Sequence, residues 1–404
     1  RKQSSLTGTA EIDLKLGTKL AKMNLHASIK APDSGISLTV GFSDILPSSL
    51  ANISRQFSLL KYLEVPVSGT FATKFFFNGA IEAVDFDVKL DKGIVKITNP
   101  LKLALPLQSG RLKGSYNQGQ SLLIIQRFDL NLGPTGQLNL PQPINHKLPL
   151  RNLSIVANYM FDKQKLELEE VFADLAGPIL NSRGVFQEIA GQMSFAISGD
   201  LRDMEIDTIG NYWPKSIKPV PRKWVSENVS VGSIPIARAK MSGRWSKGIG
   251  VRIDSLIGDL SLRNLTVDYY APMPKATGAN GNAKFDKEMF EIELDEADAG
   301  GLAFHNGRML FRGLGEVDQY SDIQLRIDGS LKSTLDLISG KPLEFAKAID
   351  IKTYNLAGTG STEVKLNFIV ERTLTPDQVT YSADSILRDV SISNIAYGKT
   401  LTHG

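Results

Sequence analysis

Four histidines are the residues of this sequence best suited to bind a metal or to carry a proton at neutral pH. His26, His146, His305 and His403 stand far apart along the chain. None has the H-E-x-x-H or H-x₃₋₅-H spacing that brings two imidazoles to one zinc ion. We therefore expect no histidine metal site, and we expect His26 and His305 at wetted strand or turn positions.

A dense acidic segment is the second candidate, because clustered carboxylates can bind calcium. Its members are Glu288, Glu291, Glu293, Asp295, Glu296 and Asp298. Their spacing is not that of a calcium loop. Three of them alternate with Phe290, Ile292 and Leu294, and successive side chains of a strand point to opposite faces. The segment therefore predicts the polar face of a strand, and no metal is expected.

The sequence also lacks the motifs of nucleophilic catalysis and of phosphate binding. The chain has no cysteine, which excludes a thiol nucleophile, a disulfide and a cysteine metal site. No G-x-S-x-G elbow occurs, and the glycine-rich stretch at residues 358–362 lacks the lysine of a phosphate loop. No acid, base and nucleophile converge, so we expect a protein that is not an enzyme and that has no cofactor.

The charge balance argues against nucleic acid as a partner. The chain has 46 Lys and Arg against 43 Asp and Glu, a formal net charge of +3. Nucleic-acid-binding domains usually gather many unopposed basic residues on one face. No run of like charges occurs here that would do so.

The elements that must position all these side chains follow a period of two. The pattern is clearest where apolar and charged residues alternate through Val84, Asp85, Phe86, Asp87, Val88, Lys89 and Leu90. It recurs at residues 10–16, 23–29, 36–42, 193–197, 290–294, 323–327 and 364–368. Such alternation is typical of antiparallel sheets with one apolar and one wetted face. The predicted fold class is all-β: a long antiparallel, curled β-sheet of roughly twenty strands.

About three short helices are expected where the alternation stops. Apolar residues stand three and four apart in residues 44–63, 212–228 and 333–348, and the prolines at 47, 214, 221 and 342 suit first-turn positions. A glycine that opens a new strand follows each segment, at Gly69, Gly232 and Gly358. This order predicts a weak internal repeat. Turns between strands are predicted at residues 32–35, 91–93, 117–119, 278–281 and 305–307, each of which contains glycine with asparagine or aspartate.

The apolar faces of so many strands exceed what three short helices can cover. Two arrangements remain open from the residues alone. Two sheets could close on each other as a sandwich, or one sheet could curl into a trough whose inner face meets another apolar body. Large exposed apolar patches usually mark a ligand or partner site.

One segment, residues 211–232, resembles a block of the AsmA-like proteins of the YhdP type. The block has the pattern Y-W-P, then R-x-W-V-x-E-N-V, then a glycine. The positions matched are Trp213, Pro214, Arg222, Trp224, Asn228 and Gly232. Residues 331–370 and 379–390 resemble the C-terminal repeat of the same family, and residues 47–69 resemble a diverged copy. From the residues alone, the tryptophans would plug an apolar sheet edge beside a short helix, and Arg222 would pair with Glu227.

The resemblance implies a periplasmic β-groove related to TamB-type proteins, anchored in the bacterial inner membrane. It implies transport of phospholipid toward the outer membrane, in support of envelope integrity, with no catalytic residues. No membrane-spanning stretch occurs in the sequence. We therefore expect the anchor, and the contacts with both membranes, in segments outside this chain, which begins Arg1-Lys2-Gln3 and looks like an internal fragment.

The inward side chains of the strands are the expected lining of such a groove, where they would hold phospholipid acyl chains. They are Ile12, Leu14, Leu25, Ile29, Leu38, Val40, Phe75, Phe77, Phe86, Val88, Phe195, Ile197, Phe290, Ile292, Leu325, Ile327, Leu366 and Phe368. Residues 1–404 are expected to form one elongated groove fragment, with sub-repeats at 1–110, 111–270 and 271–404.

Two alternative functions remain. Exposed strand edges could offer β-augmentation to a nascent outer-membrane protein, which would make the chain an assembly factor. A closed core would make it a purely structural β scaffold.

Overall fold

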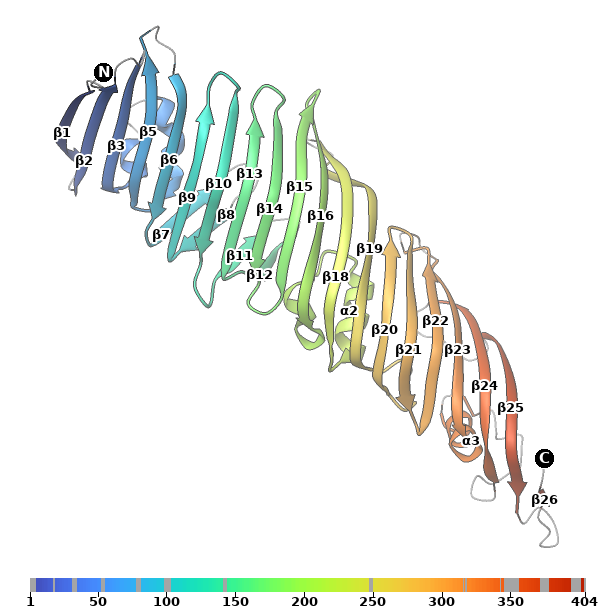
Figure 1. The fold of residues 1–404 in the computed structure, drawn as a ribbon. Helices are drawn as coiled ribbons and strands as arrows, with labels where there is room; N and C mark the ends of the chain where they lie inside the picture. Colours follow the sequence, from blue (N-terminus) through green and yellow to red (C-terminus); the bar gives the residue numbers. More distant parts are fainter. Residues whose placement is uncertain are drawn as a thin grey trace. The chain divides into compact units, whose positions relative to one another are not determined.

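Antiparallel strand pairs dominate the computed structural model of the chain (Figure 1). The principal sheet has 21 strands, and two smaller sheets contain β4, β7 and β8, and β11 and β12. The all-β, curled-sheet prediction is confirmed. The structure describes residues 5–16, 19–30, 35–51, 55–77, 81–97, 103–140, 144–246, 250–314, 316, 318–341, 343–344, 356–370, 378–393 and 401–402.

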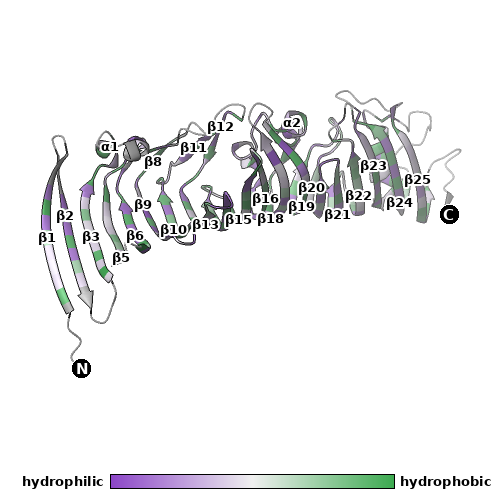
Figure 2. Cartoon of the chain, turned by 90° about the horizontal axis from the view of Figure 1, so that it is seen from above, coloured by the Kyte–Doolittle hydropathy of each residue, from purple (hydrophilic) through white to green (hydrophobic). Residues whose placement is uncertain are grey.

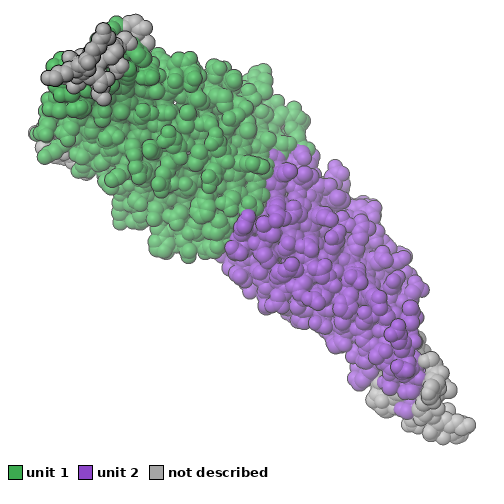
Figure 3. All heavy atoms as spheres, in the orientation of Figure 1, with its two compact units in different colours: residues 1–200, 214–217, 242–254 green, residues 201–213, 218–241, 255–404 purple. Residues whose placement is uncertain are grey.

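The chain divides into two compact units (Figure 3). Unit 1 comprises residues 1–200, 214–217 and 242–254, and unit 2 comprises residues 201–213, 218–241 and 255–404. Each unit is described by itself below. The division into sub-repeats 1–110, 111–270 and 271–404 stays a prediction.

Unit 1 is built on long antiparallel strands, most of them joined at one end by short turns, and several joined at the other end by longer connections that contain small elements. These connections contain α1, the 3₁₀ helix η1 and the strands β4, β7, β8, β11 and β12. The elements are β1 Ser5–Leu16, β2 Lys19–Lys30, β3 Gly35–Ile45, α1 Pro47–Leu50, η1 Arg55–Tyr62, β4 Leu63–Glu64, β5 Val67–Phe76, β6 Ile81–Leu90, β7 Gly93–Ile97, β8 Leu103–Leu107, β9 Ser109–Asn117, β10 Leu122–Asn131, β11 Gln137–Leu140, β12 His146–Pro149, β13 Asn152–Met160, β14 Lys165–Asp174 and β15 Ile179–Ile189.

Three strands have residues in both units: β16 Gln192–Glu205, β18 Ser233–Ser246 and β19 Gly250–Val267. Unit 2 likewise has long antiparallel strands, and the connections between some of them contain the helices η2, α2 and α3. Its other elements are η2 Ile206–Asn211, α2 Pro219–Asn228, β17 Val229–Ser230, β20 Ala276–Asp286, β21 Met289–Ala299, β22 Leu302–Arg312, β23 Tyr320–Ser330, α3 Leu331–Ser339, β24 Leu356–Ile369, β25 Thr380–Ile392 and β26 Leu401–Thr402.

All three predicted helical segments contain a helix, with shifted boundaries. Pro47 begins α1 as expected, but α2 begins at Pro219 rather than near Trp213 or Pro214. Helix α3 begins two residues before the predicted segment, and residues 342 and 345–348 of that segment lie outside the described residues. Ser330 caps α3, since its hydroxyl accepts a hydrogen bond from the Ser333 amide at 3.0 Å.

The predicted turn at residues 117–119 joins the paired strands β9 and β10, and residues 91–92 separate β6 from β7. Residues 32–34 lie outside the described residues. The predicted turns at residues 278–281 and 305–307 are wrong. Both stretches lie inside strands, β20 and β22, where the pairing register shifts. Gly278 has a φ of +63° and Asn306 a φ of +49°. Glycine and asparagine tolerate this left-handed conformation, and at these two positions they form β-bulges rather than turns. Bulges of this kind bend a strand without ending it.

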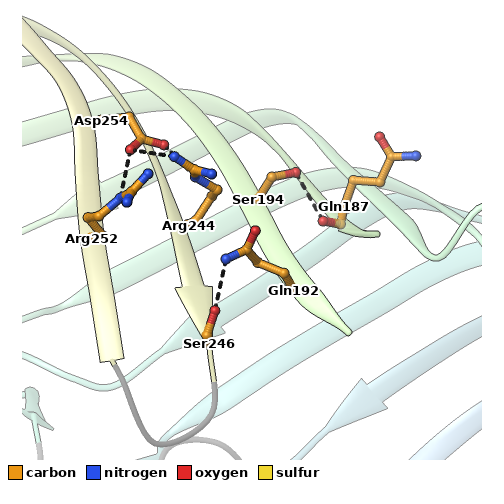
Figure 4. Close-up of polar contacts among 7 residues, drawn as sticks. All are labelled: Gln187, Gln192, Ser194, Arg244, Ser246, Arg252 and Asp254. Carbon is orange, nitrogen blue, oxygen red and sulfur yellow. Dashed lines mark hydrogen bonds and ion pairs between the residues drawn. The ribbon is translucent and has the colours of Figure 1, made fainter. Parts of the chain in front are cut away.

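The polar face of the sheet bears cross-strand ion pairs. In unit 1, Arg244 donates to both carboxylate oxygens of Asp254 at 2.8 and 3.0 Å, and Arg252 donates to the same carboxylate at 3.1 Å (Figure 4). Beside them, the Gln192 amide donates to the Ser246 hydroxyl at 2.9 Å. The acidic segment of β21 behaves similarly, because Glu293 pairs with Lys284 and Glu291 with Arg308. Its predicted role as a polar strand face is confirmed.

Candidate functional site

One row of side chains crosses unit 1 from strand to strand at the same level. We call it the central row. It begins with Ala10 of β1, which pairs with Leu25, and it continues through directly opposed partners into β15. The register gives the order Ala10, Leu25, Val40, Phe71, Phe86, Gly114, Ile125, Ala157, Leu168 and Gly184. Every member is apolar, so the row is an uninterrupted apolar track perpendicular to the strands.

Two parallel rows flank the central row on the same face. The inner row runs through Ile12, Met23, Phe42, Gly69, Val88, Leu112, Phe128, Ile155, Val171 and Ser182. The tip-side row, nearer the hairpin tips, runs through Gly8, Ala27, Leu38, Thr73, Val84, Tyr116, Leu123, Tyr159, Leu166 and Phe186. Together the three rows form what we call the open lane.

A fourth row, the capped row, lies beyond the inner row at the opposite ends of the strands. Ile45, Leu90, Leu130 and Ala173 belong to it and are all buried. The small elements close over this edge, as the positions of α1, β8, β11 and β12 along one side of the sheet show (Figure 2). Leu105 and Leu107 of β8 complete this core together with Val65, Leu132 and Leu150 of the connecting segments, and all five are buried.

The open lane has no such cover. Of the central row, only Gly114 and Ala157 are buried, and Phe71 is 42% exposed. Phe75 is also exposed, and Phe77 beyond it is 67% exposed. The sandwich alternative is therefore wrong for unit 1, because no second sheet packs on these rows in the described part of the chain. The lane is an apolar surface that another apolar body can occupy.

Unit 2 has the same arrangement of capped and uncovered rows. One row runs Leu260, Ala283, Ile292, Met309, Ile323, Leu366 and Tyr381, and a neighbouring one runs Gly258, Phe285, Phe290, Phe311, Ser321 and Phe368. Its capped end is a core of Met204, Ile206, Ile234, Leu265, Ala279 and Ala297. Leu302, Leu331 and Leu335 are buried near α3.

The structure places the predicted lining residues on these apolar rows. Leu25, Val40 and Phe86 lie in the central row, Ile12 and Val88 in the inner row and Leu38 in the tip-side row. Phe75 pairs with Ile36 and Ile81 one step nearer the tips. Phe195 and Phe186 stack at 6.2 Å, and Ile197 follows on β16. In unit 2, Phe290, Ile292, Leu325, Ile327, Leu366 and Phe368 share one face. The side chains of Leu14 and Ile29 lie outside the described residues.

Strands β9, β10, β13 and β14 contribute lane residues that the sequence reading missed. In β10 the register shifts between Ile125 and Phe128, so an extra residue interrupts the alternation. A second shift separates Leu168 from Val171 in β14. A bulge of one residue moves all following side chains to the other phase. The sequence does contain a signal for the β10 bulge: the inward apolar residues stand at odd positions before it, 123 and 125, and at even positions after it, 128 and 130.

Most of the tryptophan block of residues 211–232 lies in unit 2 and has a structural role there. Arg222 donates through Nε to the Trp213 carbonyl at 2.6 Å and through Nη2 to the Gly210 carbonyl at 3.1 Å. The predicted Arg222–Glu227 pair is wrong, since these carbonyls hold the guanidinium and Glu227 lies 3.8 Å from Lys223. Trp224 is 46% exposed, so it is not a core residue.

The end of the same block joins α2 to the next strands. The Asn228 side chain donates to the Trp224 carbonyl at 2.9 Å, and the Asn228 backbone carbonyl accepts from the Asp268 backbone amide at 2.8 Å. Gly232 has a φ of +76°, and a Cβ there would lie 2.3 Å from the Arg263 carbonyl oxygen. Only glycine fits this position. Pro214, which follows Trp213, begins no helix.

Ionisable groups form no reactive cluster in the described part of the chain. No group of three or more His, Asp or Glu residues there could hold a metal ion. The hydrogen bond from Arg111 lowers the pKa of Asp87, and hydrogen bonds from Ser361 and Arg326 lower the pKa of Asp328. Both carboxylates lie on the polar face and form ordinary ion pairs or hydrogen bonds.

No helix among the described residues is long and apolar enough to cross a bilayer. No curated protein matches the chain in sequence. A solved structure titled "Crystal structure of Acinetobacter baumannii OccAB1" is similar over 95% of both chains at 9% identity with a TM-score of 0.19, which is too low to support an argument.

The family comparison gives a positive result. A family model described as "YhdP protein" matches residues 78–380, well over half of the chain. This span includes the tryptophan block, the open lane of unit 1 from β6 onward and most of unit 2. The expected family is confirmed: the chain belongs to the YhdP family.

Proposed function

We propose that this chain is a lipid-binding groove segment that carries phospholipid acyl chains along its open lane. The observation that carries the proposal is the central row of unit 1, which stays apolar through ten paired strands and is only partly buried. Burial of one methylene group is worth about 0.8 kcal/mol, so a sixteen-carbon chain gains on the order of 12 kcal/mol on leaving water.

The even chemistry of the lane supports transport rather than storage. Leu, Ile, Val, Phe, Ala and Gly line the central row, and no ion pair interrupts it among the described residues. An acyl chain then meets similar surroundings at each step, and movement is fast only where no position binds much more tightly than its neighbours. A specific pocket would have the opposite effect.

Membership of the YhdP family supports a place for this segment in the bacterial cell envelope. We place it on the periplasmic side of the inner membrane, in a protein anchored by segments outside this chain. Its cargo would be phospholipid moving toward the outer membrane, and its role would be binding and transport rather than catalysis.

Mass spectrometry of lipid extracted from the purified protein tests the proposal. We expect phospholipid to copurify with the wild-type chain and to be lost from a Val40→Asp, Phe86→Asp double variant, whose carboxylates point into the lane. Thr39→Asp is the matched control, because Thr39 neighbours Val40 but lies on the polar face opposite His26. Absence of phospholipid from the folded wild-type protein would refute the proposal, as would full retention by the double variant.

The edge strand β25 supports a second candidate, an assembly factor that acts by β-augmentation. The far side of β25 pairs with β26 only at Ser391 and Ile392 among the described residues, and the side chains at 382–389 are exposed. Photo-crosslinks from residue 384 or 386 to a folding outer-membrane protein would favour this candidate. Copurified lipid with no such crosslink would favour the first.

A further inference from the structure

Three aromatic side chains gather where the open lane of unit 1 meets the hairpin tips. Tyr159 and Phe161 contact edge to face with ring centroids 4.6 Å apart, and Tyr116 and Phe161 do so at 5.6 Å. Phe161 is 47% exposed. Neither Tyr116 nor Tyr159 has a hydrogen-bond partner for its hydroxyl among the described residues. We call this group the rim cluster.

The rim cluster stands on the boundary between apolar and polar surroundings. Tyr116 and Tyr159 belong to the tip-side row, with Leu123 between them. Just beyond them, the β9–β10 tip contains Asn117, Gln118 and Gln120, of which both glutamines are exposed. Tyrosine favours such boundaries because its ring is apolar and its hydroxyl is polar, and membrane proteins use it at the level of lipid headgroups.

The opposite edge of the lane offers no place for a headgroup. The capped row is closed there by the small elements, with Leu130 buried at 4% exposure and Leu107 at 1%. A headgroup at that edge would have to bury its phosphate and charge among leucines, at a cost of several kcal/mol. The hairpin-tip edge, by contrast, opens directly to water.

The width of the lane matches the length of lipid tails. On β13, Ile155 of the inner row and Tyr159 of the tip-side row are four residues apart, about 13 Å at the rise of a β-strand. One leaflet of a bilayer has a hydrocarbon depth of about 15 Å, half of the full core. Tails that point from the rim toward the capped row would therefore fill the lane.

We infer that the rim cluster is the headgroup-level binding site for glycerophospholipid in unit 1, and that bound tails lie along the strands, pointing to the capped row. This inference rests on the proposed function and specifies the orientation of its cargo. The tyrosine hydroxyls would donate to the ester or phosphate oxygens, while Phe161 would cover the first methylenes. Lipids would then stand side by side along the track rather than end to end.

Fluorescence quenching in the full chain tests the orientation. The wild-type sequence has no cysteine, so single-cysteine variants label at one site. A bimane label at Lys163→Cys would report the rim, and one at Leu112→Cys the inner row. Each labelled protein is loaded with phosphatidylcholine that carries a nitroxide either on the headgroup or near the end of one acyl chain. Lys113→Cys, on the polar face beside Leu112, is the control.

We expect the headgroup nitroxide to quench the rim label at least about twofold more than the inner label, and the chain-end nitroxide to do the reverse. Equal quenching by both lipids, or the reverse order, would overturn the orientation and leave the proposed function standing. No quenching at either lane position would overturn both.

The cluster itself is tested by removal of its hydroxyls. Tyr116→Phe and Tyr159→Phe keep the rings, and we expect each to lower phospholipid retention by about twofold to tenfold, the equivalent of one hydrogen bond. Dialkyl ether lipids, which lack ester carbonyls, show whether the ester or the phosphate is the acceptor. Unchanged retention in the double variant, with the quenching order intact, would remove the cluster from the site.

Discussion

Two leucines of the same strand and the same face have different environments. On β10, Leu130 lies in the capped row and is 4% exposed, whereas Leu123 lies in the tip-side row and is only half-buried. Leu130 stands between Asp129 and Asn131, and Leu123 between Leu122 and Ile124. The difference is the cover: the β11–β12 hairpin and the β4–β7–β8 sheet close one edge of unit 1, and nothing described closes the other. Stability therefore depends on the capped edge, while the open lane remains available for a ligand.

The largest expected effect is on the capped edge. Leu107→Ala removes a fully buried side chain, and we expect a loss of about 2–5 kcal/mol in the free energy of unfolding. Leu112→Ala, the same change in the open lane, should cost less than half as much. Urea unfolding followed by circular dichroism measures both. Equal losses would mean that the lane contributes to the core as much as the capped edge does.

A smaller effect is expected where the capped edge of unit 2 depends on polar contacts. Arg222→Gln removes two hydrogen bonds to the Trp213 and Gly210 carbonyls, and we expect unfolding to become easier by about 1–3 kcal/mol. Lys223→Gln is the control, because that side chain is solvent-exposed and should change stability by less than about 0.5 kcal/mol. Thermal unfolding of both variants measures these changes in stability. If Arg222→Gln unfolds at the wild-type temperature, Arg222 has no structural role.

Ion pairs on the polar face should matter less than either edge. Arg244→Gln breaks a two-pronged contact with Asp254, and we expect a cost of about 0.5–1 kcal/mol at low salt. At 1 M salt most of that difference should vanish, since exposed charges are screened. A cost that persists in high salt would show that packing, not charge, holds these strands.

The smallest effect is a change with pH. Arg111 lowers the pKa of Asp87 in the folded chain, so this carboxylate stabilises the fold above its unfolded pKa of about 3.9. That contribution is lost as the pH falls through the lower folded pKa. Arg111→Gln should raise the pKa of Asp87, as measured by NMR titration of its carboxyl carbon. An unchanged pKa would mean that the pair does not form in solution.

The sequence predicted the strands, their two faces and the family, because each rests on local alternation or on a contiguous motif. Phe86 and Val88 could be assigned to the apolar face from their charged neighbours, and Val40 from its alternation with Leu38 and Phe42. The sequence did not predict which end of each strand is covered. Leu90 in the capped row and Phe86 in the open lane both stand between charged residues, so nothing local distinguishes them. The rim cluster was also out of reach, because Tyr116, Tyr159 and Phe161 come together only through the register of β9, β10 and β13.

The bulges of β10 and β14 are places where this sheet can change by a single residue in evolution. Each adds one residue between the inner and central rows, on strands that flank β13. Deleting Gln126 alone would remove the β10 bulge but leave Phe128 and Leu130 on the lane face, because Phe128 would then follow Ile125 by two positions. Away from the bulges, tolerated insertions and deletions within these strands should involve two residues at a time, because a change of one residue turns every following side chain to the other face. The hairpin tips are free to lengthen by any number.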